Sequence, residues 1–380
     1  MTTRRPSKHA KRLALPKHAH TVLVLQGGGA LGAYQAGVYE GMAERGFAPN
    51  WLTGVSIGAV NAALIAGNAP ERRLERLQAF WDRVSSGVSI IPPPFLDPLR
   101  IAFDRMSAMA ASTFGAPGFF VPRVPPPFLE ADGSPGALSF YDTSPLRETL
   151  VELVDFDLIN RKQVRLSVGA VDVHTGNSVY FDNQQQAIGP EHIMASGALP
   201  PGFPPVVIDG NHYWDGGLVS NSPLWYVLDD SPDLNALIAQ VDLFSATGPL
   251  PQNLDEVLER SKDIQYSSKT RFNTNRVKEL EALRVALGRL LHKLPAKLHD
   301  DPDYQRLAPL SSRRRQLTIV HFINRRLAYS LSAKDYAFSR TMVRQLWEAG
   351  LEDVRRSCTN PRWRHAIEIV DGIRVFDLAG

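Results

Sequence analysis

The residues with the clearest chemical meaning form the pentapeptide Gly54-Val55-Ser56-Ile57-Gly58. A serine between two glycines, after a short apolar strand and before a helix of small residues, is typical of a nucleophile elbow. In that turn the strained backbone lifts the hydroxyl clear of its neighbours. Glycine suits the two flanking positions because larger side chains would collide in so tight a turn. The pattern predicts that Ser56 is a nucleophile, with Gly54 and Gly58 lining its site.

A serine hydroxyl needs a base that accepts its proton as it attacks. Four downstream histidines are candidates, and none has a sequence setting typical of a catalytic base: His174, His192, His212 and His321. Asp215, by contrast, follows a predicted strand directly, and Gly216 and Gly217 after it indicate tight backbone geometry. Partial desolvation would raise the pKa of a carboxylate there and make it a better base. We therefore expect Asp215 to be the base and both glycines to line the site.

A glycine-rich run closes the first predicted strand and consists of Gly27, Gly28, Gly29, Ala30, Leu31 and Gly32. Backbone N–H groups at the start of a helix favour negative charge, so we expect this run to form an oxyanion hole. The same spacing also fits the Gly-x-Gly-x-x-Gly fingerprint of dinucleotide-binding proteins. That fingerprint requires an acidic residue at the end of the second strand. Residues 47–55 contain none, which disfavours a nucleotide site.

Hydrophobic patterning predicts an α/β fold with a mostly parallel sheet. Strands at 21–26 and 51–53 alternate with helices at 33–45 and 59–67, which favours a right-handed crossover between parallel strands. The carboxyl ends of such strands lie on one edge, so the glycine run and Ser56 should converge there. Further strands are predicted at 164–173, 178–181, 206–208, 212–214, 236–244 and 317–322, and further helices at 142–154, 191–197 and 275–294.

Composition divides the chain into regions. Residues 89–136 carry Pro-Pro-Pro-Phe-Leu twice, at 92–96 and 125–129, and an exposed-looking pair, Phe119-Phe120. We interpret them as a surface insertion, either a structural excursion or an apolar lid or acyl-chain channel near the site. The predicted organisation is a basic disordered tail at 1–20, a catalytic domain at 21–250 and a mainly helical C-terminal extension at 251–380.

The totals constrain partners and location. The 380 residues carry 42 Lys+Arg against 39 Asp+Glu, a net charge of +3 that gives no argument for nucleic acid as a partner. The single cysteine, Cys358, cannot form an intrachain disulfide, and no apolar run reaches the roughly 18 residues of a spanning helix. We expect a cytoplasmic protein. The basic tail and the Lys/Arg-rich face of helix 275–294 leave peripheral membrane contact open, and the oligomeric state is open too.

Four ordered blocks between residue 22 and about residue 228 resemble the patatin-like phospholipase family. They are Gly27 to Gly32, Gly54 to Gly58, Ala195 to Pro200 leading into Phe203-Pro204-Pro205, and Asp215 to Gly217 with Asn221 and Pro223. The resemblance implies a three-layer α/β/α fold, a Ser56–Asp215 dyad and an oxyanion hole in the glycine run. It implies hydrolysis of lipid acyl esters, phospholipid or lysophospholipid, through an acyl-enzyme, without a metal or other cofactor. It carries no motif into the insertion or beyond residue 250.

Two alternatives stay open on the residues alone. One is a Ser-His-Asp esterase or acyltransferase that uses the same elbow, with His212 or His174 as base. The other is a catalytically idle lipid-binding scaffold that kept the fold. Ser196, which has no flanking elbow pattern, is expected to be a small packing residue.

Overall fold

A computed structural model of the chain describes most of its residues: 18–86, 106–107, 109–230, 235–267, 270–312, 316–325, 336, 338–363 and 372–378. Two predictions fall largely or wholly outside these ranges. They concern the basic tail at 1–20, of which only residues 18–20 are described, and the first Pro-Pro-Pro-Phe-Leu segment at 92–96.

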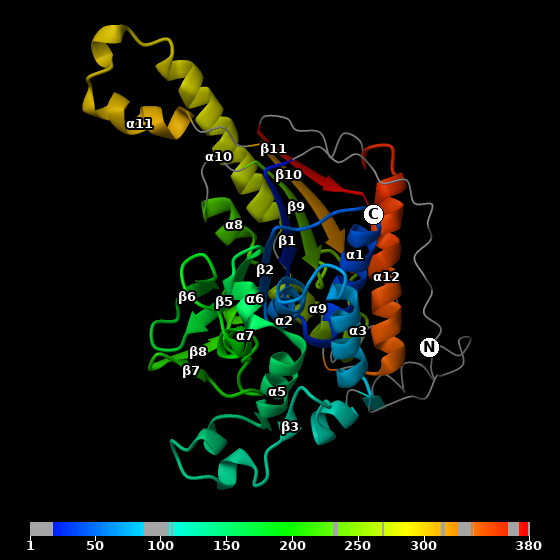
Figure 1. Cartoon of the computed structure of the whole chain (residues 1–380). Coiled ribbons are helices and arrows are strands. Elements are labelled where there is room, and N and C mark those ends of the chain that lie inside the picture. Colours follow the sequence, from blue (N-terminus) through cyan, green and yellow to red (C-terminus); the bar gives the residue numbers. More distant parts are fainter. Residues whose placement is uncertain are drawn as a thin grey trace.

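The molecule is built on a nine-stranded, mostly parallel sheet with the order β11-β10-β9-β1-β2-β5-β8-β7, and β6 pairs with β5 (Figure 1). Its strands are β1 (His20–Leu25), β2 (Trp51–Val55), β5 (Arg165–Asp172), β6 (Ser178–Asp182), β7 (Val206–Ile208), β8 (Asn211–Asp215), β9 (Asn235–Asp242), β10 (Gln316–Ile323) and β11 (Gly372–Asp377). The neighbours from β11 through β5 are parallel, whereas β6, β7 and β8 pair antiparallel. The predicted strands are all confirmed. Within this sheet, β11 is the one strand without a counterpart in the prediction.

Helices cover both faces of the sheet and give the predicted three-layer α/β/α fold. The described helices are α1 (Ala33–Glu44), α2 (Ile57–Ala66), α3 (Arg73–Val84), α5 (Ser144–Leu153), α6 (Phe156–Asn160), α7 (Pro190–Ser196), α8 (Leu224–Asp230), α9 (Leu254–Tyr266), α10 (Thr270–Leu291), α11 (Pro302–Ser312) and α12 (Arg340–Thr359). No helix in the described part of the chain is long and apolar enough to cross a membrane.

Alternating side chains of the central strands pack into two hydrophobic cores, one on each face of the sheet. In β1, Leu23 and Leu25 pack with the layer of α1, α2, α3 and α12, whereas Val22 and Val24 pack with α8 on the other face. All four side chains are fully buried. A strand buried on both faces is continuously apolar, which is why the run at 21–26 has no polar alternation.

The region after residue 250 contributes to the same layers. Strands β10 and β11 extend the sheet beyond β9, and α12 packs directly on α1. The two helices approach so closely that a Cβ on Gly37 would overlap the carbonyl oxygen of Trp347, and one on Gly350 would overlap that of Tyr34. The Tyr34 hydroxyl also donates a 2.6 Å hydrogen bond to buried Asp353. The domain boundary near residue 250 stays a prediction, but α12 is part of the core.

The described part of the insertion lies at the bottom of the view in Figure 1, beyond α5. It contains β3 (Val121–Pro122), which pairs with β4 (Tyr141–Asp142), and two short 3₁₀ turns. The expectation that Phe119 and Phe120 are exposed is wrong. Both are buried, because their rings pack against Phe203 and Phe338. The insertion is therefore anchored in the core by its aromatic pair.

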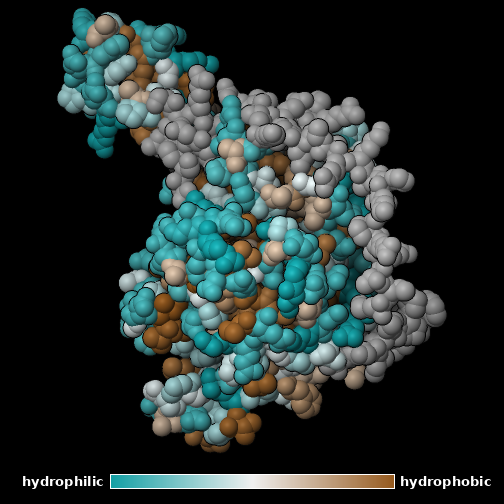
Figure 2. All heavy atoms as spheres, viewed as in Figure 1, coloured by the Kyte–Doolittle hydropathy of each residue, from teal (hydrophilic) through white to brown (hydrophobic). Residues whose placement is uncertain are grey.

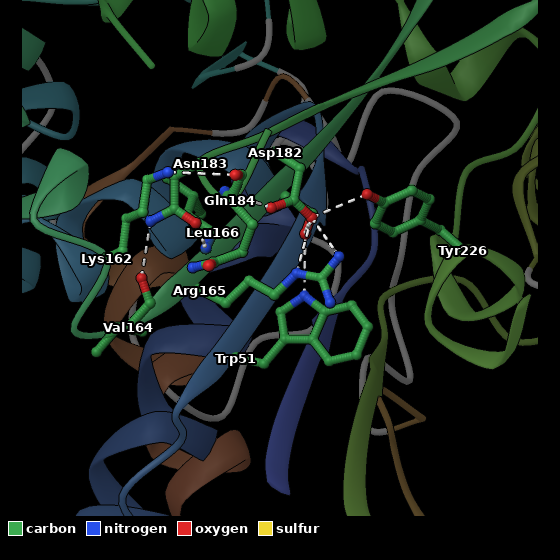
Figure 3. Close-up of polar contacts among 10 residues, drawn as sticks. Trp51, Lys162, Val164, Arg165, Leu166, Asp182, Asn183, Gln184 and Tyr226 are labelled. Carbon is green, nitrogen blue, oxygen red and sulfur yellow. Dashed lines mark hydrogen bonds and ion pairs between the residues drawn. The ribbon is translucent and has the colours of Figure 1, made fainter. Parts of the chain in front are cut away.

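A buried ion pair links β5 and β6 at the edge of the sheet where β2 and β5 begin, and Figure 3 shows Arg165 and Tyr226 of α8 beside Asp182. The Asp182 carboxylate accepts hydrogen bonds from Arg165 Nε at 2.8 Å, Ser167 Oγ at 2.7 Å and Tyr226 OH at 2.8 Å. Burial disfavours the charged form, but these donors together hold the pKa of Asp182 below its ordinary value. The arrangement explains a fully buried carboxylate that stays ionised and serves the structure.

The contact between α1 and α12 predicts a strong size limit at residue 37. Gly37→Ala should lower the free energy of unfolding by about 1 to 3 kcal/mol, because the added methyl group forces the helices apart. The matched control is Gly288→Ala in α10, where the nearest atom to a new Cβ, on Ser311, lies at 3.5 Å. That variant should be neutral or stabilising. Thermal unfolding midpoints measure both, and equal midpoints for Gly37→Ala and wild type would contradict the close approach.

Candidate active site

Ser56 lies on a strained turn between β2 and α2. Its backbone has φ 56° and ψ −127°, a conformation that residues other than glycine rarely adopt. A Cβ on Gly54 would overlap the backbone of Gly58, and one on Gly58 would overlap the carbonyl oxygen of Leu25. The geometry is that of a nucleophile elbow, and the two glycines are required by the approach of backbone to backbone.

Strand pairing brings Asp215 to this turn. Val55, the last residue of β2, lies opposite Gly169 of β5, and Asp215, the last residue of β8, lies opposite Ala170. The ends of β2 and β8 thus meet beside consecutive residues of one strand. Ser56 and Asp215 line the same pocket, the Ser56 side chain lies close enough to lower the pKa of Asp215, and Asp215 Oδ1 accepts a hydrogen bond from Gly217 N at 2.7 Å.

The environment of Asp215 favours its neutral form. The residue is 2% exposed, and its carboxyl lies near the Ser56 side chain and the Gly217 N–H but beside no cation that the structure describes. Desolvation raises the pKa of Asp215 to about 7, although these two groups act in the opposite direction. A carboxylate with a pKa near neutrality is well matched to proton transfer at physiological pH.

The glycine run borders the same site, but only its first three residues reach the pocket. Gly27, Gly28 and Gly29 line the pocket, whereas Ala30, Leu31 and Gly32 are buried in the 3₁₀ turn that leads into α1. The Gly27 N–H donates to the carbonyl of Asn221 at 3.2 Å, and the Leu31 N–H donates to that of Gly28. Among the described contacts, the N–H groups of Gly28 and Gly29 have no such backbone partner. These two groups can therefore serve a ligand.

A network of buried polar side chains holds the glycine run in place. Gln26 Oε1 accepts from the N–H groups of Leu243 and Phe244 at 2.6 and 3.0 Å. Asn221 Nδ2 donates to Gly27 O at 3.1 Å and to Tyr266 O at 2.9 Å. Sequence reasoning missed Gln26, and the one signal was a polar residue at the end of an otherwise apolar strand.

Ser196 has a larger part than the packing role expected of it. Its fully buried hydroxyl donates to Gly169 O at 2.6 Å and accepts from the Ser56 N–H at 3.0 Å. The Ser56 N–H also lies 3.1 Å from the Ser196 carbonyl oxygen. Ser196 thus ties the elbow to β5 and orients it. The packing interpretation is incomplete, because the partner of the hydroxyl lies 140 residues away in sequence.

The pocket beside Ser56 and Asp215 has mainly apolar walls. The aromatic side chains that line it come from distant parts of the chain: Phe119, Phe120, Phe203, Phe244, Tyr266, Tyr336 and Phe338. Leu199 and Ile57 complete the apolar lining. Of the remaining sequence-predicted site residues, Gly217 lines the pocket, while Gly216 packs against Gly169 and Val55. The pocket can hold an apolar chain with its polar end at the serine.

None of the candidate histidines lies among the residues that line this pocket. His174 and His212 pack against each other with ring centroids 5.7 Å apart. His192 Nδ1 accepts a hydrogen bond from Gly189 N, and burial lowers the pKa of His192. His321 is buried on β10, with Nδ1 3.5 Å from Asp242 at the end of β9. In the described part of the chain, no three His, Cys, Asp or Glu side chains gather where a metal ion could bind.

Two solved structures have a weak similarity to the chain. VipD from Legionella pneumophila has 15% identity and a TM-score of 0.32, covering 87% of this chain and 67% of that one. ExoU of Pseudomonas aeruginosa, in complex with SpcU, has 14% identity and a TM-score of 0.30, covering 90% and 78%. Scores of this size support no conclusion about fold or function. No curated protein sequence matches the chain.

The family models are decisive. The patatin-like phospholipase model matches residues 23–228, more than half of the chain, and a second model, described as patatin phospholipase, matches residues 264–368. The second match covers the region in which no motif is recognisable. Together with the fold, the first match replaces the dinucleotide alternative for the glycine run. The chain belongs to the patatin-like phospholipase family and is a lipid acyl hydrolase.

Proposed function

We propose that the chain hydrolyses the acyl esters of phospholipids or lysophospholipids with Ser56 as nucleophile and Asp215 as base. The observation that supports this proposal is that Ser56, on its strained turn, and buried Asp215 line the same apolar pocket. The family relationship supplies the substrate class, and the aromatic lining suits the acyl chain. The histidines lie away from the pocket, which favours the two-residue arrangement over a Ser-His-Asp triad.

In the first half of the reaction, Ser56 Oγ attacks the acyl carbonyl carbon while Asp215 accepts the hydroxyl proton. The carbonyl oxygen becomes an oxyanion, which the N–H groups of Gly28 and Gly29 stabilise. When the tetrahedral intermediate collapses, the bond to the alcohol breaks and Asp215 returns the proton to the departing oxygen. Ser56 is left as an acyl ester.

In the second half, a water molecule takes the place of the alcohol. Asp215 accepts its proton as the water attacks the acyl-enzyme, and the same N–H groups hold the new oxyanion. Collapse breaks the ester to Ser56, the proton returns to Oγ, and a fatty acid leaves. Burial without a neighbouring cation raises the pKa of Asp215 to about 7, so one carboxyl group can act as base and acid in turn.

The dyad predicts a clear division among substitutions. Ser56→Ala and Asp215→Asn should each lower kcat for a phospholipid or a short-chain ester by at least about 100-fold, because each removes one end of the proton transfer. His212→Ala and His174→Ala are matched controls and should retain activity. A fluorophosphonate probe should label wild type but not Ser56→Ala. Retained activity in Asp215→Asn with loss in His212→Ala would indicate a triad, and absence of labelling in folded wild type would indicate an idle scaffold.

The raised pKa of Asp215 predicts the pH dependence of the rate. Only the ionised carboxylate accepts a proton, so kcat/KM should fall about tenfold for each pH unit below about 7 and level off above it. A soluble ester whose own ionisation does not change between pH 5 and 9 measures the profile. A profile that stays flat down to pH 5 would contradict the assignment of Asp215 as a buried base.

The same pKa predicts an effect on stability that is separate from activity. Because the folded-state pKa of Asp215 is raised from 3.8 to about 7, the stability linked to its proton is complete below about pH 4 and lost as pH rises through 7. The stability of Asp215→Asn relative to wild type should therefore increase over that range, by at most about 4 kcal/mol. Unfolding midpoints across the range test this. Asp209→Asn, in the exposed turn before β8, is the control, and an identical pH trend in all three proteins would disprove the buried-charge effect.

A further inference from the structure

The described part of the insertion exposes large hydrophobic side chains at an unusual density. Val124 is 92% exposed and Phe128 is 78% exposed, and every exposed phenylalanine that the structure describes lies in this segment or, for Phe140, just after it. Figure 2 shows hydrophobic side chains on the lowest part of the molecule, where Figure 1 places the insertion. We call these residues the insertion surface: Met106, Met109, Phe114, Val121, Val124, Phe128, Leu129, Leu138 and Phe140.

The backbone beneath this surface is held in place. Arg123 N donates to Phe140 O at 3.0 Å, and Arg123 Nε donates to Ser139 Oγ at 3.0 Å. Phe140 N and Tyr141 N donate to the carbonyls of Pro201 and Gly202 at 3.1 and 2.9 Å. The insertion is thus hydrogen-bonded to the loop that carries Leu199 and Phe203 of the pocket. Its apolar side chains point outward from a fixed framework, and apolar surface of this extent marks an interaction site.

The insertion surface also adjoins the pocket in the chain itself. Phe119 and Phe120 line the pocket, and the next residue, Val121, belongs to the exposed set. A second pocket element, α9, ends at Tyr266 and exposes Leu254, Val257 and Leu258. Of these two apolar surfaces, the insertion surface starts next to residues that line the pocket, whereas Leu254, Val257 and Leu258 lie toward the other end of α9 from Tyr266.

The small number of charged side chains around the insertion indicates which kind of partner its surface can bind. Only three side chains between residues 106 and 140 are charged, namely Arg123, Glu130 and Asp132. Attraction to an anionic membrane or to a charged peptide would need a surplus of one sign. An aromatic and aliphatic surface without that surplus suits the boundary between headgroups and acyl chains.

We propose that the insertion surface docks the protein on a zwitterionic lipid layer, with its apolar side chains entering the interface next to the pocket. The proposal rests on the proposed function, because it assumes that the substrate is a lipid in a layer. Contact between the insertion surface and the lipid layer would place an acyl ester at the mouth of the pocket. Docking of this kind is governed by burial of apolar surface, so it should resist salt.

The test is flotation of the full chain with phosphatidylcholine vesicles, using Ser56→Ala so that lipid is not consumed. Adding Phe128→Ser and Leu129→Ser should weaken binding by about tenfold or more, because two exposed apolar side chains are lost from the contact. The matched control adds Leu283→Ser and Leu290→Ser in α10, which are 65% and 59% exposed in wild type. It should bind as the parent does, and high salt should leave all affinities unchanged.

A second readout separates this proposal from the proposed function. With the active protein, Phe128→Ser/Leu129→Ser should retain kcat/KM on a soluble short-chain ester and lose rate on vesicle lipid only. If wild type cleaves no ester, the proposed function is wrong. The flotation experiment still tests membrane docking, because it measures binding and not hydrolysis. The docking proposal is overturned by any of three results: no flotation, equal flotation of both double variants, or binding only to anionic vesicles. It is also overturned if sedimentation shows that the insertion surface joins two copies of the chain.

Discussion

The active-site geometry depends on one edge of β5 being shared by two strands. β2 occupies the first part of that edge in parallel and stops at the elbow, and β8 occupies the remainder from the opposite direction. Both strands end beside Gly169 and Ala170 of β5, so Ser56, which follows β2, and Asp215, which ends β8, lie next to each other. The hydroxyl of Ser196 bonds the same strand and the elbow, and so fixes the turn on β5. A shift of β8 by one residue would turn Asp215 to the other face of the sheet.

Two buried aspartates in this chain show how surroundings decide the role of a carboxyl group. Asp182 and Asp215 are both nearly inaccessible to water. Asp182 meets the Arg165 guanidinium and several further donors, so its pKa falls below its ordinary value. Asp215 meets only a hydroxyl and a backbone N–H, so desolvation dominates and its pKa rises to about 7. The first carboxylate holds strands together, and the second has the proton affinity that a base at neutral pH needs.

The pocket is built mostly by chain segments outside the glycine and serine motifs. Phe119 and Phe120 come from the insertion, and Tyr266 and Phe338 come from the region after residue 250. That region also supplies two strands and the helix that packs on α1. The motifs therefore set the chemistry, while the surrounding segments shape the space for the substrate.

The amino-acid sequence by itself determined the elements whose causes are local. The apolar run of β1, the glycines around Ser56 and the turn after Asp215 follow from backbone sterics and periodicity, so they were predictable. The pairing of β8 with β5, the burial of Phe119 and the hydrogen bonds of Ser196 were decided only by the tertiary structure. Each depends on groups far apart in the chain, and whether they meet depends on strand order and packing. The pKa of Asp215 belongs to the same class, because desolvation is a property of everything packed around the carboxyl group.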